Sequence, residues 1–359
     1  MSNLMQQCID LQPDALRRVL GKREELIEPF IAFLGDLSLR QIHLIGSGSS
    51  YHAAMMARAY MEEVLEIPVY VATPTQLNYI DSDEKDTSLV VVLSQSGQST
   101  NTIKAIKAFQ KKGYSVAALT MEANSPVAQQ ADFFLALNCG EETADQKTMG
   151  VVASVLTLQI LAVELAKRKG LLTIQEGEVF YQDAQLAAMH MEENLIVTKQ
   201  WYLENAALLQ KCTYILICGM GTLAPIGGEG ALKLVETIYL PTFAYDFEEF
   251  IHGPTALFND KTYMFFLTAH DDDNARMQKL QEMCESVGGN AFSIELTKDV
   301  PSFKEKTLSL QGEERRCFAP YALLLPLQVV SAYLSEDLGI DIDKSPFPHL
   351  ASDLDTKTT

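Results

Sequence analysis

Basic residues are scarce in this sequence. Among 359 residues, lysine and arginine together number 28 and aspartate and glutamate 47, so the formal net charge is −19. A chain this acidic is repelled by nucleic-acid backbones and by anionic lipid surfaces. We therefore expect no nucleic acid and no membrane among its partners.

Paired cysteines and zinc-ligand spacings are absent as well. The sequence has no CxxC pair and no cysteine with a histidine at metal-ligand spacing; the six cysteines are Cys8, Cys139, Cys212, Cys218, Cys284 and Cys317. This pattern argues against a disulfide framework and against a zinc site. It predicts a reducing, cytoplasmic location, and no metal or organic cofactor is implied.

No apolar stretch is long enough and free enough of polar residues to predict a membrane-spanning helix. The first twenty residues lack the apolar core of a signal peptide. The most apolar stretch, residues 151–170, carries Ser154, Thr157 and Gln159 and ends in charged residues. This stretch predicts a buried helix.

Short apolar segments alternate with helical patterns in the first half of the chain. The pattern predicts strands at 42–46, 69–73, 89–93, 115–120 and 133–137. Strands without polar positions suit a parallel sheet that helices cover on both faces, because they have no side to turn to solvent. The first half is therefore predicted to be a doubly wound α/β domain.

The second half repeats this pattern. Gly219 lies 173 residues after Gly46, and the predicted strand at 262–270 begins 173 residues after the one at 89–93, which indicates a duplicated unit. We predict two tandem flavodoxin-like α/β domains with mainly parallel sheets. The expected boundaries are a helical lead-in at 1–36, domains at 37–170 and 211–340, connecting helices at 171–210 and a tail at 341–359.

Two serine-rich loops of the first half each follow a predicted strand and open a helix: residues 46–51 and 94–100. Helix N-termini present unpaired N–H groups and a positive dipole end, so they can bind an anion without basic side chains. Simple helix capping is the alternative for one loop. Two such loops in one sheet favour a phosphate site, because ligands of doubly wound sheets bind at this edge.

The corresponding loop of the second half is acidic, with Asp271, Asp272 and Asp273, so only the first half is expected to bind an anion. A nicotinamide-binding domain is disfavoured. Residues 219–224 match GxGxxA, but Pro225 and the two glycines at 227–228 are expected to delay the helix, and no acidic residue follows the strand at 69–73.

Four ordered motifs resemble a known family: GSGSSYHA from residue 46, LSQSGQSTNT from 93, EGALKLVETIY from 229 and FEEFIHGP from 247. They are similar to the double sugar-isomerase (SIS) domain proteins, in particular the isomerase half of the glutamine:fructose-6-phosphate amidotransferases, over residues 35–343. The resemblance implies an acid/base role for Glu236 and a ring-opening role for His252. It implies that the sugar phosphate is bound by Ser49, Ser50, Ser94, Gln95, Ser96 and Ser99.

Three departures from that family matter. The glutaminase half is absent, so we expect no ammonia from glutamine by that route. Ser352 stands near the position of the family's C-terminal lysine, whose function is lost or moved to Lys344. Residues 141–148 match the family only loosely. This combination resembles the fructosamine-6-phosphate deglycases, single-chain relatives that split an amine from a phosphorylated ketosamine.

Isomerisation of a 2-ketose or cleavage of a ketosamine requires a proton to move between C1 and C2 of the substrate. One carboxylate can remove and return that proton. Glu229, Lys233 and Glu236 share one helical face, although a solvated Glu229–Lys233 pair is the ordinary interpretation. Glu229 and Lys233, with Lys344, are candidate substrate contacts. His252 precedes Gly253 and Pro254, which fix its loop, and can donate a proton near neutral pH.

The expected protein is a ketosamine 6-phosphate deglycase or isomerase without cofactor. Alternatives are an aldose–ketose or amino-sugar 6-phosphate isomerase or deaminase, and a non-catalytic sugar-phosphate sensor. The resemblance also implies a homodimer with composite active sites, in which His252 reaches the partner's site.

Overall fold

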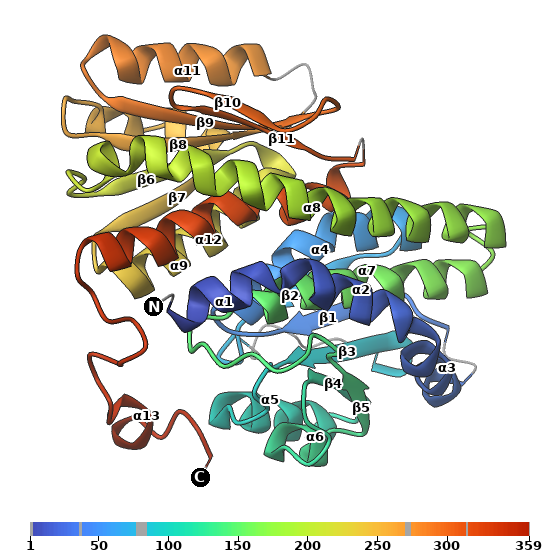
Figure 1. Ribbon diagram of the computed structural model, residues 1–359. Helices are drawn as coiled ribbons and strands as arrows, with labels where there is room; N and C mark the ends of the chain where they lie inside the picture. Colours follow the sequence, from blue (N-terminus) through green and yellow to red (C-terminus); the bar gives the residue numbers. More distant parts are fainter. Residues whose placement is uncertain (1–2, 36–37, 77–84, 270–273, 314, 359) are drawn as a thin grey trace. The chain divides into compact units, whose positions relative to one another are not determined.

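The computed structural model describes residues 3–35, 38–76, 85–269, 274–313 and 315–358. The chain divides into two compact units. The serine-loop unit comprises Asp14–Glu142, Met149–Gln182 and Lys344–Thr359. The α9 unit comprises Met1–Pro13, Thr143–Thr148 and Asp183–Asp343. Each unit is built around one sheet (Figure 1).

The sheet of the serine-loop unit has the strand order β2-β1-β3-β4-β5, and every neighbouring pair is parallel. The strands β1, β3 and β4 are buried at every residue, as their apolar sequences require. Their bounds are Gln41–Ile45 (β1), Val69–Ala72 (β2), Ser88–Leu93 (β3), Val116–Thr120 (β4) and Phe133–Ala136 (β5). This is the flavodoxin-like order, with its switch point between β1 and β3.

Helices cover both faces of this sheet (Figure 1). The helices α4 (Ser49–Leu65) and α7 (Met149–Arg168) pack together on one face, and α5 (Thr100–Lys111) and α6 (Pro126–Gln130) lie on the other. Helix α3 (Arg23–Leu34) contacts α7 and the edge strand β5. The predicted doubly wound α/β class is confirmed.

The sheet of the α9 unit repeats this order, with one added edge strand, β10, as β10-β11-β9-β8-β6-β7. All its pairs are parallel except β10 with β11. The helices α9 (Ala224–Ile238) and α12 (Ala319–Asp337) lie on one face and α11 (Asn274–Ser286) on the other (Figure 1). The strands are Ile215–Gly219 (β6), Thr242–Asp246 (β7), Tyr263–Thr268 (β8), Asn290–Thr297 (β9), Ser302–Lys304 (β10) and Thr307–Gln311 (β11).

The start of α9 corrects one expectation. A short 3₁₀ turn at Gly221–Leu223 leads into a helix that begins at Ala224, with Pro225 in its first turn. Proline needs no hydrogen-bond partner for a backbone N–H at that position, so it starts the helix rather than delaying it. The expected delay by Pro225 and the following glycines is therefore wrong.

The predicted helical lead-in consists of α1 (Leu4–Asp10), α2 (Gln12–Gly21) and α3. Helix α1 packs on α12 within the α9 unit, where the Asn3 side chain donates to the Ala332 carbonyl at 2.9 Å. The long helix α8 (Ile174–Leu209) begins in the serine-loop unit and ends in the α9 unit. The tail from Lys344 onward, with the short helix α13 (Leu350–Asp353), belongs to the serine-loop unit.

Two helices in the described part of the chain are long and apolar enough to cross a membrane. They are Met149–Arg168 and Arg316–Asp337, whose most apolar windows are 94% and 89% buried inside the fold. Such burial is the property of core helices. The sequence prediction of a buried helix at 151–170 is thereby confirmed.

Candidate active-site groups

The first serine-rich loop joins β1 to α4 in a tight turn. The Ser50 N–H donates to the Ser47 carbonyl at 3.2 Å. A Cβ added to Gly46 would lie 2.9 Å from the Ser50 backbone carbon, so this close approach requires glycine. Ser49 and Ser50 become the first two residues of α4, at the positive end of the helix dipole.

The second loop joins β3 to α5 and is equally constrained. Gly97 has φ +67°, and a Cβ there would lie 2.1 Å from the Ser125 hydroxyl. The Ser94 N–H donates to the Leu119 carbonyl at 3.1 Å, and Ser99 caps α5 by accepting from the Thr102 N–H at 3.4 Å. Since β1 and β3 flank the switch point, both predicted loops follow the two strands where such sheets bind ligands.

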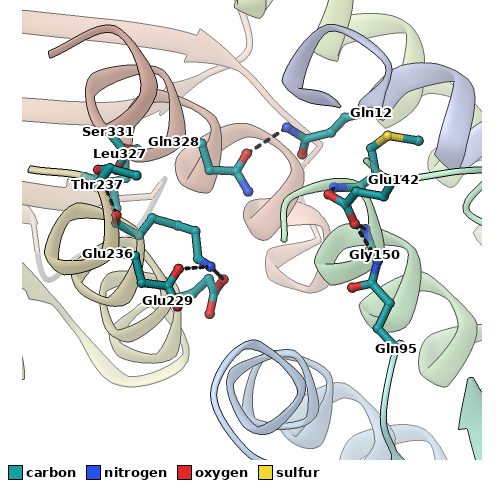
Figure 2. A network of polar contacts seen from close by, with 12 residues as sticks. Gln12, Gln95, Glu142, Gly150, Glu229, Glu236, Thr237, Leu327, Gln328 and Ser331 are labelled. Carbon is teal, nitrogen blue, oxygen red and sulfur yellow. Dashed lines mark hydrogen bonds and ion pairs between the residues drawn. The ribbon is translucent and has the colours of Figure 1, made fainter. Parts of the chain in front are cut away.

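A buried carboxylate, Glu142, organises the surroundings of the second loop (Figure 2). Its two oxygens accept from the N–H groups of Met149 at 2.9 Å and Gly150 at 3.0 Å, at the start of α7. It also accepts a short hydrogen bond from the side-chain amide of Gln95. The amide of Gln95 lies so close to α7 that a Cβ on Gly150 would approach its Oε1 to 2.0 Å. The Gln95 side chain is therefore fixed by an internal contact.

In the α9 unit, three charged groups of α9 meet (Figure 2). The Lys233 ammonium lies 2.6 Å from Oε2 of Glu236 and 3.5 Å from Oε1 of Glu229. The side chains of Lys233 and Glu229 are 1% and 0% exposed, whereas that of Glu236 is 38% exposed. The ordinary interpretation of Glu229–Lys233 as a solvated pair is thus wrong, because the packing of α9 buries both groups.

Glu236 is anchored through one oxygen only. Its Oε2 receives the Lys233 hydrogen bond, and Oε1 makes no hydrogen bond to any residue in the described ranges. Because a third of the side chain is open, a carboxylate oxygen is available to a ligand while the other is fixed. This is a geometry that suits proton transfer.

Close packing of α9 on α12 holds this cluster in place (Figure 2). A Cβ on Gly230 would lie 2.2 Å from Leu327 of α12, so glycine is needed for the approach. Thr237 bonds back to the Lys233 carbonyl at 2.9 Å. Beside them, the Gln12 amide donates to the Gln328 amide oxygen at 2.7 Å within the core.

His252 ends the short helix α10 (Phe247–Ile251) and is exposed. Its backbone N–H donates to the Glu249 carbonyl at 3.3 Å. Asp246 caps α10 by accepting from the Glu248 N–H at 2.9 Å, and its second oxygen accepts from the Gly221 N–H at 2.8 Å. In the α9 unit, the Asp246 carboxylate thus already accepts the hydrogen bond of a backbone N–H in the loop after β6. Asp271–Asp273 lie outside the described residues.

The tail positions singled out from the sequence are also described. Ser352 lies in α13, and its hydroxyl donates to the His349 carbonyl at 2.9 Å. Lys344 is exposed at the start of the tail. The contacts of Glu142 and Asp246 were not predicted from the sequence. The only sequence signal was the pair Glu141 and Glu142 in residues 141–148, which match the family loosely.

A comparison with protein-family models identifies the two halves. The SIS domain model matches residues 38–166 and 208–334. The chain belongs to the SIS domain family. The resemblance noted from the four sequence motifs is confirmed, as are the two tandem domains.

Curated relatives support this assignment. The chain is 28% identical over 350 residues to the glutamine–fructose-6-phosphate aminotransferase (isomerizing) of Clostridium perfringens, covering 94% of this chain and 56% of that protein. It is 29% identical over 311 residues to the enzyme of the same name from Pyrobaculum aerophilum, covering 86% and 50%. The chain thus spans about half the length of the curated relatives it matches.

Solved structures share the fold along the whole chain. A protein of Clostridium difficile 630, named provisionally as a phosphosugar isomerase, has a TM-score of 0.90 and 26% identity and covers 100% of this chain and 99% of that one. The C-terminal domain of glucosamine-fructose-6-phosphate aminotransferase from Francisella tularensis has a TM-score of 0.86 at 23% identity, covering 96% and 98%.

Proposed function

We propose that this SIS-family chain is a phosphosugar enzyme that moves a proton between C1 and C2 of a 6-phosphorylated ketosamine or ketose, with deglycase chemistry favoured. The observation that carries the proposal is the α9 cluster, in which Lys233 is buried against Glu229 and holds one oxygen of a half-open Glu236. A purely structural ion pair does not need the second, exposed carboxylate.

The substrate phosphate is assigned to the two serine loops of the serine-loop unit. Ser49 and Ser50 start α4, and Ser99 caps α5 after Ser94, Gln95 and Ser96. Helix N-termini bind phosphate through backbone N–H groups and the dipole. These loops contain no basic residue, so hydroxyls and amides supply the contacts in a chain of net charge −19.

Glu236 is assigned as the acid/base. On a ketosamine, its carboxylate removes a C1 proton, and the electrons form an enaminol with the C2 oxygen protonated. Return of the proton to C2 gives an aldimine between C1 and the amine nitrogen. Water then adds to C1 and the amine leaves, which yields an aldose 6-phosphate. On a ketose, the same two proton transfers complete an isomerisation.

Lys233 is assigned as a positioning residue and His252 as the group that protonates a ring oxygen or a leaving amine. A histidine exchanges protons near neutral pH, as this role needs. We further propose a cytoplasmic homodimer in which His252 of one subunit serves the partner's site, so that two composite sites form about a twofold axis.

Deglycase chemistry is favoured over isomerisation by the C-terminal segment. The family's lysine position holds Ser352, whose hydroxyl is engaged within α13. Both Glu236 and His252 are retained, which favours catalysis over a non-catalytic sensor.

The deciding experiment measures turnover of a panel: fructosamine 6-phosphates with several amines, fructose 6-phosphate and glucosamine 6-phosphate. Release of amine with formation of an aldose 6-phosphate is expected for at least one fructosamine phosphate. Turnover of fructose 6-phosphate alone would identify an isomerase instead of a deglycase. Turnover of glucosamine 6-phosphate alone would identify a deaminase. Phosphate-dependent binding without any turnover would identify a sensor.

A further inference from the structure

The two repeats differ at one crossover between strands. In the serine-loop unit the chain passes from β4 to β5 through helix α6, whose Val127 packs in one core cluster with Val116 and Ala118 of β4. In the α9 unit the crossover from β9 to β11, residues 298–306, carries the short strand β10 instead of a helix. The face of β9 and β11 beside α11 therefore has, among the described residues, no counterpart of α6 (Figure 1).

The strip of sheet left open in this way is polar. Side chains of a strand alternate between its two faces, so Ser293 and Glu295 of β9 share a face with Ala291, which belongs to the core that α11 covers. The register places Thr268, the last residue of β8, beside Glu295, and Thr307 of β11 beside Ser293. Hydroxyls and a carboxylate thus form the floor that apolar residues form in the first repeat.

Helix α11 adds a polar wall. Its buried residues Met277, Leu280 and Cys284 face the core. A neighbouring stripe, in which the residues follow one another at helical spacing, is polar throughout: Asn274, Gln278, Gln281, Glu282 and Glu285. A groove of about 340 Å³ is lined by this stripe and by the polar floor. Its volume lies within the range of small-molecule sites, about 300–1,000 Å³.

Two hydroxyls of the floor lack partners. Thr268 and Ser293 are only 9% and 8% exposed, and both line the groove. Neither hydroxyl has a hydrogen-bond partner within the ranges that the structure describes. The carboxylate of Glu295, in contrast, is fixed, because its Oε1 accepts from the Ser309 hydroxyl at 2.6 Å. A hydroxyl that is nearly removed from water and unpaired is unfavourable, so these two groups indicate a ligand that completes their hydrogen bonds.

The charges of the lining select the kind of ligand. The charged groups that the described residues contribute to this groove are all carboxylates, those of Glu282, Glu285 and Glu295. A carboxylate only accepts hydrogen bonds, whereas a hydroxyl both donates and accepts. Cations line only the adjoining hollow beyond Glu285, where Lys304 and Lys306 lie. The groove therefore favours a ligand that carries a positive charge and several hydroxyls, and it disfavours a phosphate.

We propose that the groove between α11 and the open face of β9 and β11 is a second ligand site, which binds an unphosphorylated polyhydroxylated amine. The glutamates of the lining hold the ammonium group, and the hydroxyls of Thr268, Ser293 and Thr307 bind the hydroxyls of the ligand. This inference goes beyond the proposed function and does not rest on it. The groove lies on the face of the sheet opposite α9, the helix that carries Glu236 (Figure 1).

The test measures binding of three probes to the full chain by calorimetry: glucamine (1-amino-1-deoxy-D-glucitol), sorbitol and hexylamine. Glucamine has both the charge and the hydroxyls, so it should bind about tenfold more tightly than either of the others. Glu295→Gln keeps the shape and removes the charge, which should weaken glucamine about five- to tenfold and sorbitol less. Thr268→Val replaces a hydroxyl by a methyl group and should weaken both glucamine and sorbitol about fivefold.

Two more variants serve as controls. Glu193→Gln removes an exposed carboxylate of α8 with the same change in net charge and should bind as the wild type does. Glu282→Gln changes an exposed residue of α11, so it tests the groove without altering the core, even where Thr268→Val fails to fold. Absence of glucamine binding at millimolar concentration, equal binding of all three probes, or wild-type affinity in both Glu295→Gln and Glu282→Gln would overturn the inference.

One comparison separates this site from the proposed active site. Glu236→Gln should bind glucamine with wild-type affinity. Loss of binding in Glu236→Gln, with wild-type affinity in Glu295→Gln, would place the amine at Glu236 and overturn the inference, while the proposed function would stand. If the chain turns over no phosphosugar, the proposed function fails, and binding of glucamine in the groove is still expected.

Discussion

The ammonium of Lys233 lies 2.6 Å from Oε2 of Glu236, and the lysine side chain is 1% exposed. A buried lysine is retained in its charged form only when carboxylates compensate the loss of water. Here Glu229, completely buried, and the half-open Glu236 share that task from one face of α9. The same ion pairs therefore stabilise the helix and fix the carboxylate that we propose as the acid/base.

Lys233→Met tests this arrangement. The methionine keeps an apolar stem but leaves Glu229 buried without its cation, which should lower the free energy of unfolding by about 3–5 kcal/mol. The double variant Glu229→Gln/Lys233→Met should recover much of this loss, since no buried charge remains, but should stay inactive. Urea unfolding and turnover measure the two effects. Equal stability of Lys233→Met and the wild type would contradict the assignment.

Glu236→Gln should abolish turnover and leave ligand affinity within a few fold. The amide keeps the shape but cannot accept the proton, and loss of a general base costs about 10²- to 10⁴-fold in rate. Exchange of the substrate C1 or C2 hydrogen with heavy water, followed by NMR, should also vanish. Exchange at the wild-type rate would move the base elsewhere, with Glu229 as the first candidate.

The serine loops predict that recognition depends on phosphate. A phosphorylated ligand at 100 times its Kd should stabilise the protein by about 2.7 kcal/mol, and the unphosphorylated sugar should do little. Replacement of both Ser94 and Ser96 by alanine should remove the thermal shift. Shifts that are equal for the two sugars, or that survive the double replacement, would show that the loops are assigned wrongly.

Gly150→Ala tests the fixed position of Gln95. The added Cβ would lie 2.0 Å from Oε1 of Gln95, so the variant should be less stable and bind the phosphorylated ligand more weakly. With Gln95→Ala as background the clash with that side chain disappears, so Gly150→Ala should destabilise the protein much less than it does in the wild type. Thermal unfolding of the four proteins measures this difference, and an equal destabilisation in both backgrounds would contradict the fixed position of Gln95.

The composite-site proposal is tested by mixing inactive Glu236→Gln and inactive His252→Ala subunits under conditions of subunit exchange. A hybrid dimer would have one site with both defects and one with neither. With statistical mixing, half the dimers are hybrids, so about a quarter of the wild-type activity should return. Absence of recovery in verified hybrid dimers would show that each site takes both residues from one chain.

The local pattern of apolar and polar residues in the sequence alone determined much of the fold of this protein. The uniformly apolar segment at 89–93 and the apolar centre of the segment at 115–120 predict buried parallel strands, because these residues have no polar side to turn to water. The 173-residue interval predicted the duplicated unit, and serines directly after strands predicted helix N-termini. The strand β7 and the short pair β10 and β11 were not predicted, because they are partly polar and gain their pairing from the sheet they join.

Only the tertiary structure decided which charged residues are buried and which segments meet. The spacing of Glu229 and Lys233 is that of a solvated helical pair, and it is the packing of α12 on α9 that removes both from water. Glu142 reaches Gln95 across 47 residues of sequence, and Lys357 pairs with Ser99 from the far end of the chain. Such contacts depend on where the sheet carries each loop, and residues so distant in sequence leave no periodic signal from which to predict them.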